Sequence, residues 1–461
     1  MPAPSADEGP DHVTSTPETA PPLRAGTLTT PAPRRGGQPS VPVWPVIVLV
    51  AGYPVAWALG LAVVFPVVMA LVQVAFLIQR GTFRVDVVLG LYVAFALWAL
   101  TSLVLIDSPG QAVGYVQKYS ELVVAGVVLA YARALPGRSL RYVVDAMVAF
   151  WVAVVLLGEL ATWIPDVRLQ APFGVLLTSV LPGAISGNEL VRDLLLPSMA
   201  EVQQIWGASE PFNRPAAPFP YANSWGSAVA LLTPVVLARL TWSSRRTKIL
   251  LLAVLVLSIH PILASGNRSM ALALAVCGAY VTIRLIARGR LRSGARLLTL
   301  GALAVVALIA SGAVGSFFER QVVSGGASAD TRVAVYVETV RATLQSPLVG
   351  WANPRTDSTI GIALGTQGQI WSVMYSYGFV GLALFCAFLA ALVWRARRAP
   401  GTAGLWLHGV LIASVVMLPF YRLGVMQMVV LVCVGAVLTH PRVRELLPDP
   451  RGGAAPRAWK A

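Results

Sequence analysis

The stretch 365-GTQGQIWSVMYSYGFVGLALFCAFLAALVWRARR-398 contains the pattern from which the fold follows. It opens on glycines and two glutamines, continues through an apolar run over about 373–394, and ends in three arginines. About 20 apolar residues in a row are what an α-helix needs to cross a bilayer, and Lys and Arg accumulate in cytoplasmic loops. The stretch therefore predicts a transmembrane helix that enters from a polar outer loop and leaves at an arginine-rich inner loop.

The composition of the whole chain agrees with this pattern. Of the 461 residues, 56% are hydrophobic and only 12% are charged, whereas soluble domains carry about 25% charged residues. A net charge of +15 would suit a nucleic-acid partner, but inner loops rich in Lys and Arg account for it equally well. We therefore predict a membrane protein with several spans and no nucleic-acid partner.

Apolar segments of similar length recur along the chain, and we predict an all-α fold with about twelve transmembrane helices. Pro54 and Pro66 interrupt the first two segments, which are joined by a very tight turn. The segments run over about 43–59, 61–79, 86–106, 115–133, 141–163, 222–240, 248–265, 269–287, 295–315, 373–394, 402–420 and 423–440.

Charge places the two sides of the predicted membrane domain. Every second loop is short, rich in arginine and nearly free of acids. The positive-inside rule makes these loops cytoplasmic and puts both termini in the cytoplasm of a plasma-membrane protein. The basic residues of these loops are Arg80 and Arg84; Arg133, Arg138 and Arg141; Arg239, Arg245, Arg246 and Lys248; Arg284, Arg288, Arg290, Arg292 and Arg296; and Arg395, Arg397 and Arg398.

This topology gives three regions. Residues 1–42 are rich in Pro, Ala, Thr and Gly without apolar periodicity, which predicts a disordered cytoplasmic tail. Residues 43–440 form the transmembrane domain, and 441–461 form a second cytoplasmic tail.

Two long loops, 164–221 and 316–372, lie on the outer face in this topology. Apolar residues at helical spacing predict short surface helices within 187–207 and 331–350. Asp330 is a candidate N-cap for the second helix, and Pro347 is a candidate stop. Folded, functional backbone is expected in such loops because lipid cannot satisfy irregular backbone groups.

The sequence contains no recognisable metal-binding or nucleotide-binding motif. All four histidines, His12, His260, His408 and His440, lie outside the two long outer loops, so a histidine-centred site within those loops is excluded. The three cysteines fall in apolar segments and predict core residues. We therefore expect neither a metal nor a cofactor.

Three arginines are the remaining candidates for chemistry on the outer face. Arg268 lies in the turn 265-SGNRSMALAL-274, Arg332 begins the second surface helix, and Arg214 precedes Asn223 at the mouth of a span. Several guanidinium groups around one outer cavity would suit a diphosphate, because the planar fork matches phosphate oxygens. The alternatives are local: Arg268 as a cap of helix carbonyls, and Arg332 paired with Asp330 or Glu338.

The order and side of these motifs resemble a known family. The segments 265-SGNRSMALAL-274, 331-TRVAVYVETVRATLQSPLVGW-351 and 367-QGQIWSVMYSYGFVGLALF-385 are similar to those of the O-antigen ligase and Wzy-type polymerase superfamily. The resemblance implies transfer of an undecaprenyl-diphosphate-linked glycan to an acceptor hydroxyl on the outer face. Arg268 and Arg332, with Arg214 as a third, would then bind the diphosphate, and a histidine of the second long loop would act on the acceptor.

The sequence departs from the family at that histidine, where it has Gln367. An amide can orient a hydroxyl but cannot take its proton. One interpretation is that Gln367 orients the acceptor; a second is a non-catalytic relative that binds lipid-linked glycan. A third assigns proton transfer to another group, and the candidates are Glu319, Asp330, Glu338, Asp357 and His260.

A secondary transporter is the alternative from another class of protein. Lys118 with Glu121, and Asp145 and Glu159, are charged residues within predicted spans, as transporters often have. The long loops lie outside, however, and the two halves of the chain do not resemble each other.

Overall fold

The computed structural model describes residues 40–81, 85–181, 183, 189–203, 212–310, 332–357 and 361–447. The chain divides into the units Met1–Gln38 and Pro39–Ala461, and all described residues belong to the second unit. The first predicted tail, apart from its last residues, and the tail beyond residue 447 therefore lie outside the described residues.

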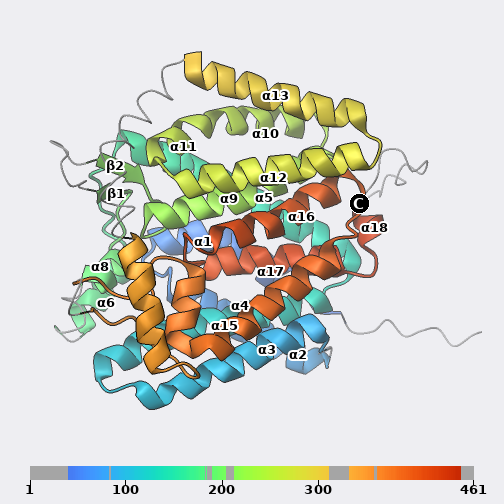
Figure 1. Cartoon of the computed structure of the whole chain (residues 1–461). Coiled ribbons are helices and arrows are strands. Elements are labelled where there is room, and N and C mark those ends of the chain that lie inside the picture. Colours follow the sequence, from blue (N-terminus) through green and yellow to red (C-terminus); the bar gives the residue numbers. More distant parts are fainter. Residues whose placement is uncertain are drawn as a thin grey trace, which may run out of the picture. The chain divides into compact units, whose positions relative to one another are not determined.

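The described chain is almost entirely helical, and helices occupy all twelve predicted ranges (Figure 1). The predicted range 86–106 contains α3 followed by the 3-10 helix η1, and the range 248–265 contains α10 and α11, which meet at Ser258. The bounds are α1 Trp44–Ala58, α2 Val64–Arg80, α3 Val87–Ala99, η1 Leu100–Leu105, α4 Pro109–Ala134, α5 Leu140–Trp163, α9 Ala222–Leu240, α10 Arg245–Leu257, α11 Ile259–Ser265, α12 Arg268–Ala287, α13 Leu291–Ala310, α15 Gln369–Ala396, α16 Gly401–Met417 and α17 Val425–Thr439.

Five helical stretches of the described residues are long and apolar enough to cross a membrane, by length and composition. They are Val87–Leu105, Gly137–Trp163, Arg245–Ser265, Arg268–Ala287 and Gln369–Ala396. Four further apolar helices, α1, α2, α16 and α17, are shorter. An all-α protein with several helices of membrane-spanning character agrees with the predicted fold class at this level.

Local signals explain where several helices begin and end. The Asp86 carboxylate accepts a hydrogen bond from the Leu89 amide at 3.0 Å and caps α3. Asn267 caps α12 in the same way. Gly81 ends α2 in the left-handed region, with φ 57°, where a side chain would be strained.

The helices α9, α16 and α17 form the centre of the packing. Helix α9 contacts α5, α12, α16 and α17, and its large side chains, such as Trp225 and Leu232, are fully buried. Helices α10 and α13, by contrast, expose apolar side chains such as Leu252 and Leu303. Exposed apolar surface of this extent is expected where lipid replaces protein as the neighbour.

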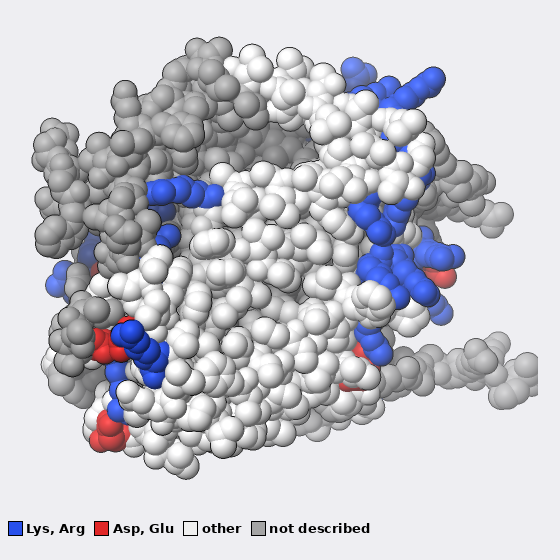
Figure 2. Space-filling view, in the orientation of Figure 1, with Lys and Arg blue, Asp and Glu red and all other residues white. Residues whose placement is uncertain are grey.

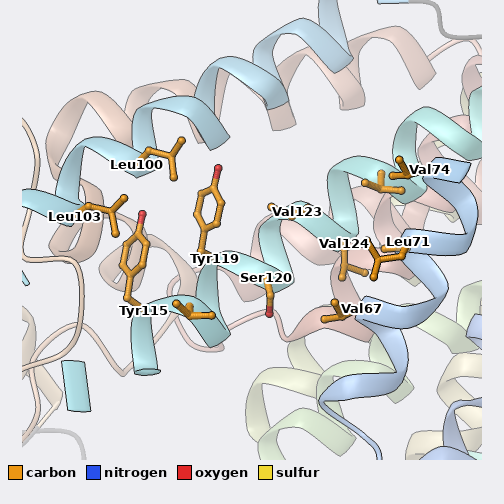
Figure 3. A pocket seen from close by; sticks show the side chains of 13 residues that line it. Val67, Leu71, Val74, Leu100, Leu103, Tyr115, Tyr119, Ser120, Val123 and Val124 are labelled. Carbon is orange, nitrogen blue, oxygen red and sulfur yellow. The ribbon is translucent and has the colours of Figure 1, made fainter. Parts of the chain in front are cut away.

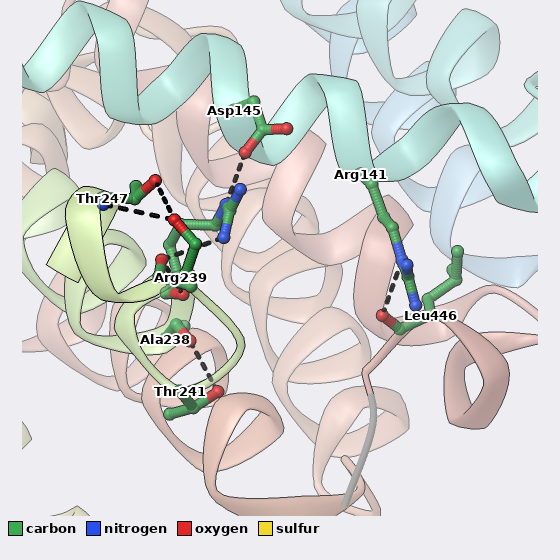
Figure 4. Close-up of polar contacts among 9 residues, drawn as sticks. Arg141, Asp145, Ala238, Arg239, Thr241, Thr247 and Leu446 are labelled. Carbon is green, nitrogen blue, oxygen red and sulfur yellow. Dashed lines mark hydrogen bonds and ion pairs between the residues drawn. The ribbon is translucent and has the colours of Figure 1, made fainter. Parts of the chain in front are cut away.

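One end of the described structure is held together by arginines (Figure 4). Arg239 Nε bonds the Asp145 carboxylate at 2.6 Å, and Arg141 donates to the carbonyls of the short helix α18, Val443–Leu446. On the face drawn in Figure 2, Lys and Arg side chains gather at the end where α18 lies in Figure 1. This is the end that the positive-inside rule assigns to the cytoplasm.

The opposite end carries the smaller elements: α6 Pro172–Val180, α8 Glu189–Leu195, and the strands β1 Ala200–Gln203 and β2 Phe212–Pro215 (Figure 1). The strands pair antiparallel, with Glu201 opposite Arg214. The prediction of short helices within 187–207 is therefore right for α8 and wrong for residues 200–203, which form β1. Pairing with β2 satisfies the backbone hydrogen bonds of this segment, and the sequence pattern does not show that pairing.

Candidate functional site

The candidate site is built around the turn between α16 and α17. The amide of Gln369 donates to the Tyr421 carbonyl at 2.9 Å, and the Gln369 side-chain oxygen accepts from the Leu423 amide at 2.9 Å. Gly368 lies so close that a Cβ at this position would overlap the Pro419 carbonyl oxygen. The glutamine-containing end of the second long loop is thus fixed directly on this turn.

A second segment reaches the same carbonyl. Residues 332–345 form a helix that ends before Pro347, as predicted. Tyr336 of this helix stacks on Trp371, with ring centroids 4.3 Å apart and planes inclined by 15°. The Tyr336 hydroxyl donates to the Pro419 carbonyl at 3.3 Å and the Trp371 ring nitrogen at 2.9 Å, so one oxygen holds helix 332–345 and the start of α15 together.

Arg214 lies on β2 of the β1–β2 hairpin and is buried where this strand contacts α11. Its Nε donates to the Ser265 carbonyl at 2.7 Å, and Nη2 donates to the Asn223 side-chain oxygen at 3.2 Å. Arg214 as a whole residue is only 8% exposed. Burial lowers the pKa of Arg214, while Glu201, its partner across the hairpin, and Tyr421 raise it. Even so lowered, an arginine stays charged in proteins.

Tyr421 connects two of the three predicted arginines. Its side chain is 6% exposed, and burial raises the pKa of the phenol, whereas Ser269, Arg214 and Arg332 each lower it. Arg332 also acts electrostatically on Arg214 itself. The structure therefore brings Arg214 and Arg332 into one electrostatic environment, around a phenol that stays protonated at neutral pH.

Arg268 is placed differently. It is the exposed first residue of α12, directly before the Ser269 that acts on Tyr421. Among the described residues, neither its guanidinium nor that of the exposed Arg332 makes a hydrogen bond or ion pair. The structure thus gives no contact that joins Arg268 to the other two arginines.

Gln367 lies two residues before α15 and is partly exposed. Its amide nitrogen donates to the Thr366 hydroxyl at 3.4 Å. Gln367 directly precedes Gly368, the residue in close contact with the Pro419 carbonyl.

The remaining predicted site residues are only partly brought to this place. Asn223 is the partner of Arg214. Glu338 pairs with Arg341 at 3.2 Å, so the alternative pairing of Arg332 with Glu338 is not formed. His260 pairs with Glu159 at 2.9 Å, on α11 and α5. Glu319 and Asp330 lie outside the described residues.

Two adjoining spaces lie beside α2 and α4, and the smaller of them reaches the same turn. A groove of about 380 Å³ runs between α2, η1 and α4 (Figure 3). A smaller pocket of about 130 Å³ contains Arg422, which pairs with Glu121 of α4 at 2.6 Å. The sequence pointed to Glu121 but not to Arg422 or Tyr421, although 420-FYRLG-424 places aromatic and charged residues in a short turn.

Within the described ranges, no group of three or more His, Cys, Asp and Glu side chains is arranged to hold a metal ion.

Comparison with protein-family models gives no match to the chain, and comparison with curated proteins finds no similar sequence. The assignment of a function consequently depends on the outer-loop motifs and on the geometry of the described site.

Proposed function

We propose that the protein transfers a lipid-diphosphate-linked glycan to an acceptor hydroxyl on the outer face of the plasma membrane. The observation that carries the proposal is that Arg214 and Arg332 both lower the pKa of the buried Tyr421 phenol, which lies on the turn to which the Gln367 segment is fixed. Two of the segments that resemble the O-antigen ligase and polymerase superfamily supply Arg332 and Gln367, whereas Arg214 and Tyr421 lie outside those segments.

The membrane topology is part of the proposal. All twelve helical ranges cross the bilayer, both termini are cytoplasmic, and the arginine-rich end seen in Figure 2 faces inward. The turn between α16 and α17, the hairpin and helix 332–345 then lie together at the outer surface, where a lipid-linked donor presents its diphosphate.

The chemistry needs charge neutralisation more than a strong base. The acceptor oxygen forms a bond to the anomeric carbon, and the bond from that carbon to the diphosphate breaks. Arg332 and Arg214 stabilise the negative charge that develops on the leaving diphosphate. Because Gln367 cannot accept a proton, the acceptor proton passes to the departing diphosphate, and Gln367 orients the hydroxyl.

The arginine function is tested with purified protein in nanodiscs and undecaprenyl diphosphate as the probe. Arg332→Ala removes an exposed guanidinium with no structural hydrogen bond, so we expect weaker binding by at least about tenfold, the loss of one charge-assisted contact. Arg341→Ala is the matched control, because Arg341 lies on the same helix and pairs with Glu338. Equal affinities for the two variants would refute the arginine site.

The role of Gln367 is tested by transfer from an undecaprenyl-diphosphate-linked oligosaccharide. We expect Gln367→Ala to lower kcat without changing donor affinity. We expect Gln367→His to retain or raise kcat, because an imidazole can take the acceptor proton. The same rate for all three proteins would remove this position from the mechanism. Donor binding without transfer would favour a non-catalytic lipid-linked glycan-binding protein.

The transporter alternative receives less support from the described residues. Its three candidate carboxylates have partners: Glu121 pairs with Arg422, Asp145 with Arg239, and Glu159 contacts the His260 ring. Uptake of solute by proteoliposomes that contain a transfer-inactive protein would favour it.

A further inference from the structure

At the arginine-rich end of the structure, the loop that follows α12 is fixed to the loop that follows α15. Arg288 donates to the carbonyls of Ala399 at 3.1 Å and Gly401 at 3.4 Å. Arg290 Nη1 bonds the Thr402 hydroxyl at 2.9 Å. These contacts join the two loops into one surface, although more than a hundred residues of sequence separate them.

Three further arginines of this surface have no partner, and we call them the free arginines. Arg292, Arg296 and Arg398 are exposed, and their side chains make no hydrogen bond or ion pair with any described residue. No Asp or Glu occurs in 284–300 or in 395–408. Because no carboxylate of these segments neutralises the free arginines, the surface favours an anionic partner.

The face of α13 that carries two of the free arginines continues as an apolar surface. Arg292, Arg296, Leu300 and Leu303 follow one another at helical spacing and therefore share a face. Leu300 is 64% exposed and Leu303 is 59% exposed. Positive charge followed along one face by exposed hydrocarbon matches a phospholipid, whose phosphate lies at the membrane surface and whose acyl chains lie below it.

A tryptophan at the same loops has the character of a residue at the membrane surface. Trp394, near the end of α15, is 64% exposed, and the Arg397 guanidinium carbon lies 3.5 Å from the centre of its ring. Tryptophan is enriched at the headgroup level of bilayers. Figure 2 shows Lys and Arg side chains at the end where α12 passes into α13 in Figure 1. In the proposed topology this end lies at the inner leaflet.

We infer that the free arginines bind the phosphate of an anionic phospholipid of the inner leaflet, with an acyl chain along Leu300 and Leu303. Basic residues that cluster at the cytoplasmic end of membrane helices are well suited to anionic headgroups. A nucleic acid would use the charge but not the exposed leucines below it. The inference uses the proposed topology and is independent of the transfer reaction.

The test measures the binding of phosphatidylglycerol to the full chain in neutral detergent, with bound lipids counted by native mass spectrometry. Phosphatidylcholine with the same acyl chains is the neutral reference. A triple variant carries Arg292→Gln, Arg296→Gln and Arg398→Gln. We expect this variant to bind phosphatidylglycerol at least about tenfold more weakly than the unaltered protein, because three charges near the headgroup are lost. Binding of phosphatidylcholine should not change.

The matched control carries Arg245→Gln, Arg246→Gln and Lys248→Gln. These three basic residues at the start of α10 are also exposed, and their side chains make no hydrogen bond or ion pair with described residues. We expect the control to bind phosphatidylglycerol as the unaltered protein does. An equal loss in the two variants would show attraction to net charge alone and would overturn the site, as would undiminished binding by the triple variant.

Two further outcomes would assign the surface to another ligand and overturn the inference. One is displacement of phosphatidylglycerol by glycerol phosphate, which carries the same phosphate without acyl chains. The other is binding of a short DNA duplex that the triple variant loses. If circular dichroism shows the triple variant to be unfolded, Arg296→Gln alone takes its place, with an expected loss of about threefold for phosphatidylglycerol.

Discussion

At the scale of single residues, Tyr421 is the part of the site that sequence could not supply. Arg214 and Arg332 were candidates because several guanidinium groups around one outer cavity would suit a diphosphate. A tyrosine in a short turn carries no such signal, since tyrosine is common at membrane interfaces. Its role depends on the folded positions of Ser269, Arg214 and Arg332 around it, which come from three distant parts of the chain.

The raised pKa of Tyr421 predicts a dependence of stability on pH. Burial raises the pKa of the Tyr421 phenol in the folded state above its ordinary value of 10.0. The contribution of this phenol to the free energy of unfolding is therefore complete below pH 10.0 and declines as the pH rises through the pKa of the folded state. We expect Tyr421→Phe to reduce the loss of thermal stability between pH 8 and pH 11. A Tyr142→Phe variant is the control, because that ring is exposed. Identical pH profiles for Tyr421→Phe and the unaltered protein would contradict this.

At the scale of elements, apolar spacing predicted where helices form but not always which face of a helix is buried. Val333, Val337 and Leu344 fall on one face of helix 332–345, as the sequence indicates, yet this face is exposed. The buried face contains Val335, Thr339 and Thr343, because each threonine hydroxyl bonds a carbonyl of the helix's own preceding turn. Threonines satisfied in this way can be buried without a partner elsewhere.

Glycines at contacts between elements predict contrasting effects of the same substitution. Gly368→Ala places a methyl group against the Pro419 carbonyl, and we expect a loss of about 1–3 kcal/mol, typical of overpacking. Gly278→Ala, within α12 and with nothing near the added carbon, is expected to stabilise by about 0.5–1 kcal/mol, because glycine weakens a helix interior. Unfolding in detergent measures both. A neutral Gly368→Ala would show that the loop and the turn are not in close contact.

At the scale of the whole molecule, composition and hydrophobic segments were sufficient to predict an all-α protein with several helices long and apolar enough to cross a membrane. The sequence did not predict which helices lie at the centre. Helices α9 and α17 are apolar on every side, and only packing distinguishes a helix surrounded by protein from one surrounded by lipid. The hairpin was missed for a related reason, since its two strands are stabilised by each other and not by a local pattern.

The proposed topology predicts the accessibility of single cysteines in intact cells, in a background with Cys277, Cys386 and Cys433 replaced. Cysteine at Thr366 or Tyr221, in the proposed outer loops, should react with a membrane-impermeant maleimide. Cysteine at Arg246 or Arg398, in the proposed inner loops, should react only after the membrane is made permeable. Labelling of Arg398→Cys in intact cells would reverse the orientation.

The adjacency of Tyr421 and Arg422 has a consequence for how this site can vary. Tyr421 interacts with Arg214 and Arg332, and the next residue, Arg422, lines the smaller pocket and pairs with Glu121. The relative position of the arginine site and this pocket therefore depends on chain length as well as on residue identity. A single residue inserted between them would leave all side chains chemically intact and still separate the two sites. Substitutions elsewhere in the turn can therefore accumulate more freely than insertions or deletions.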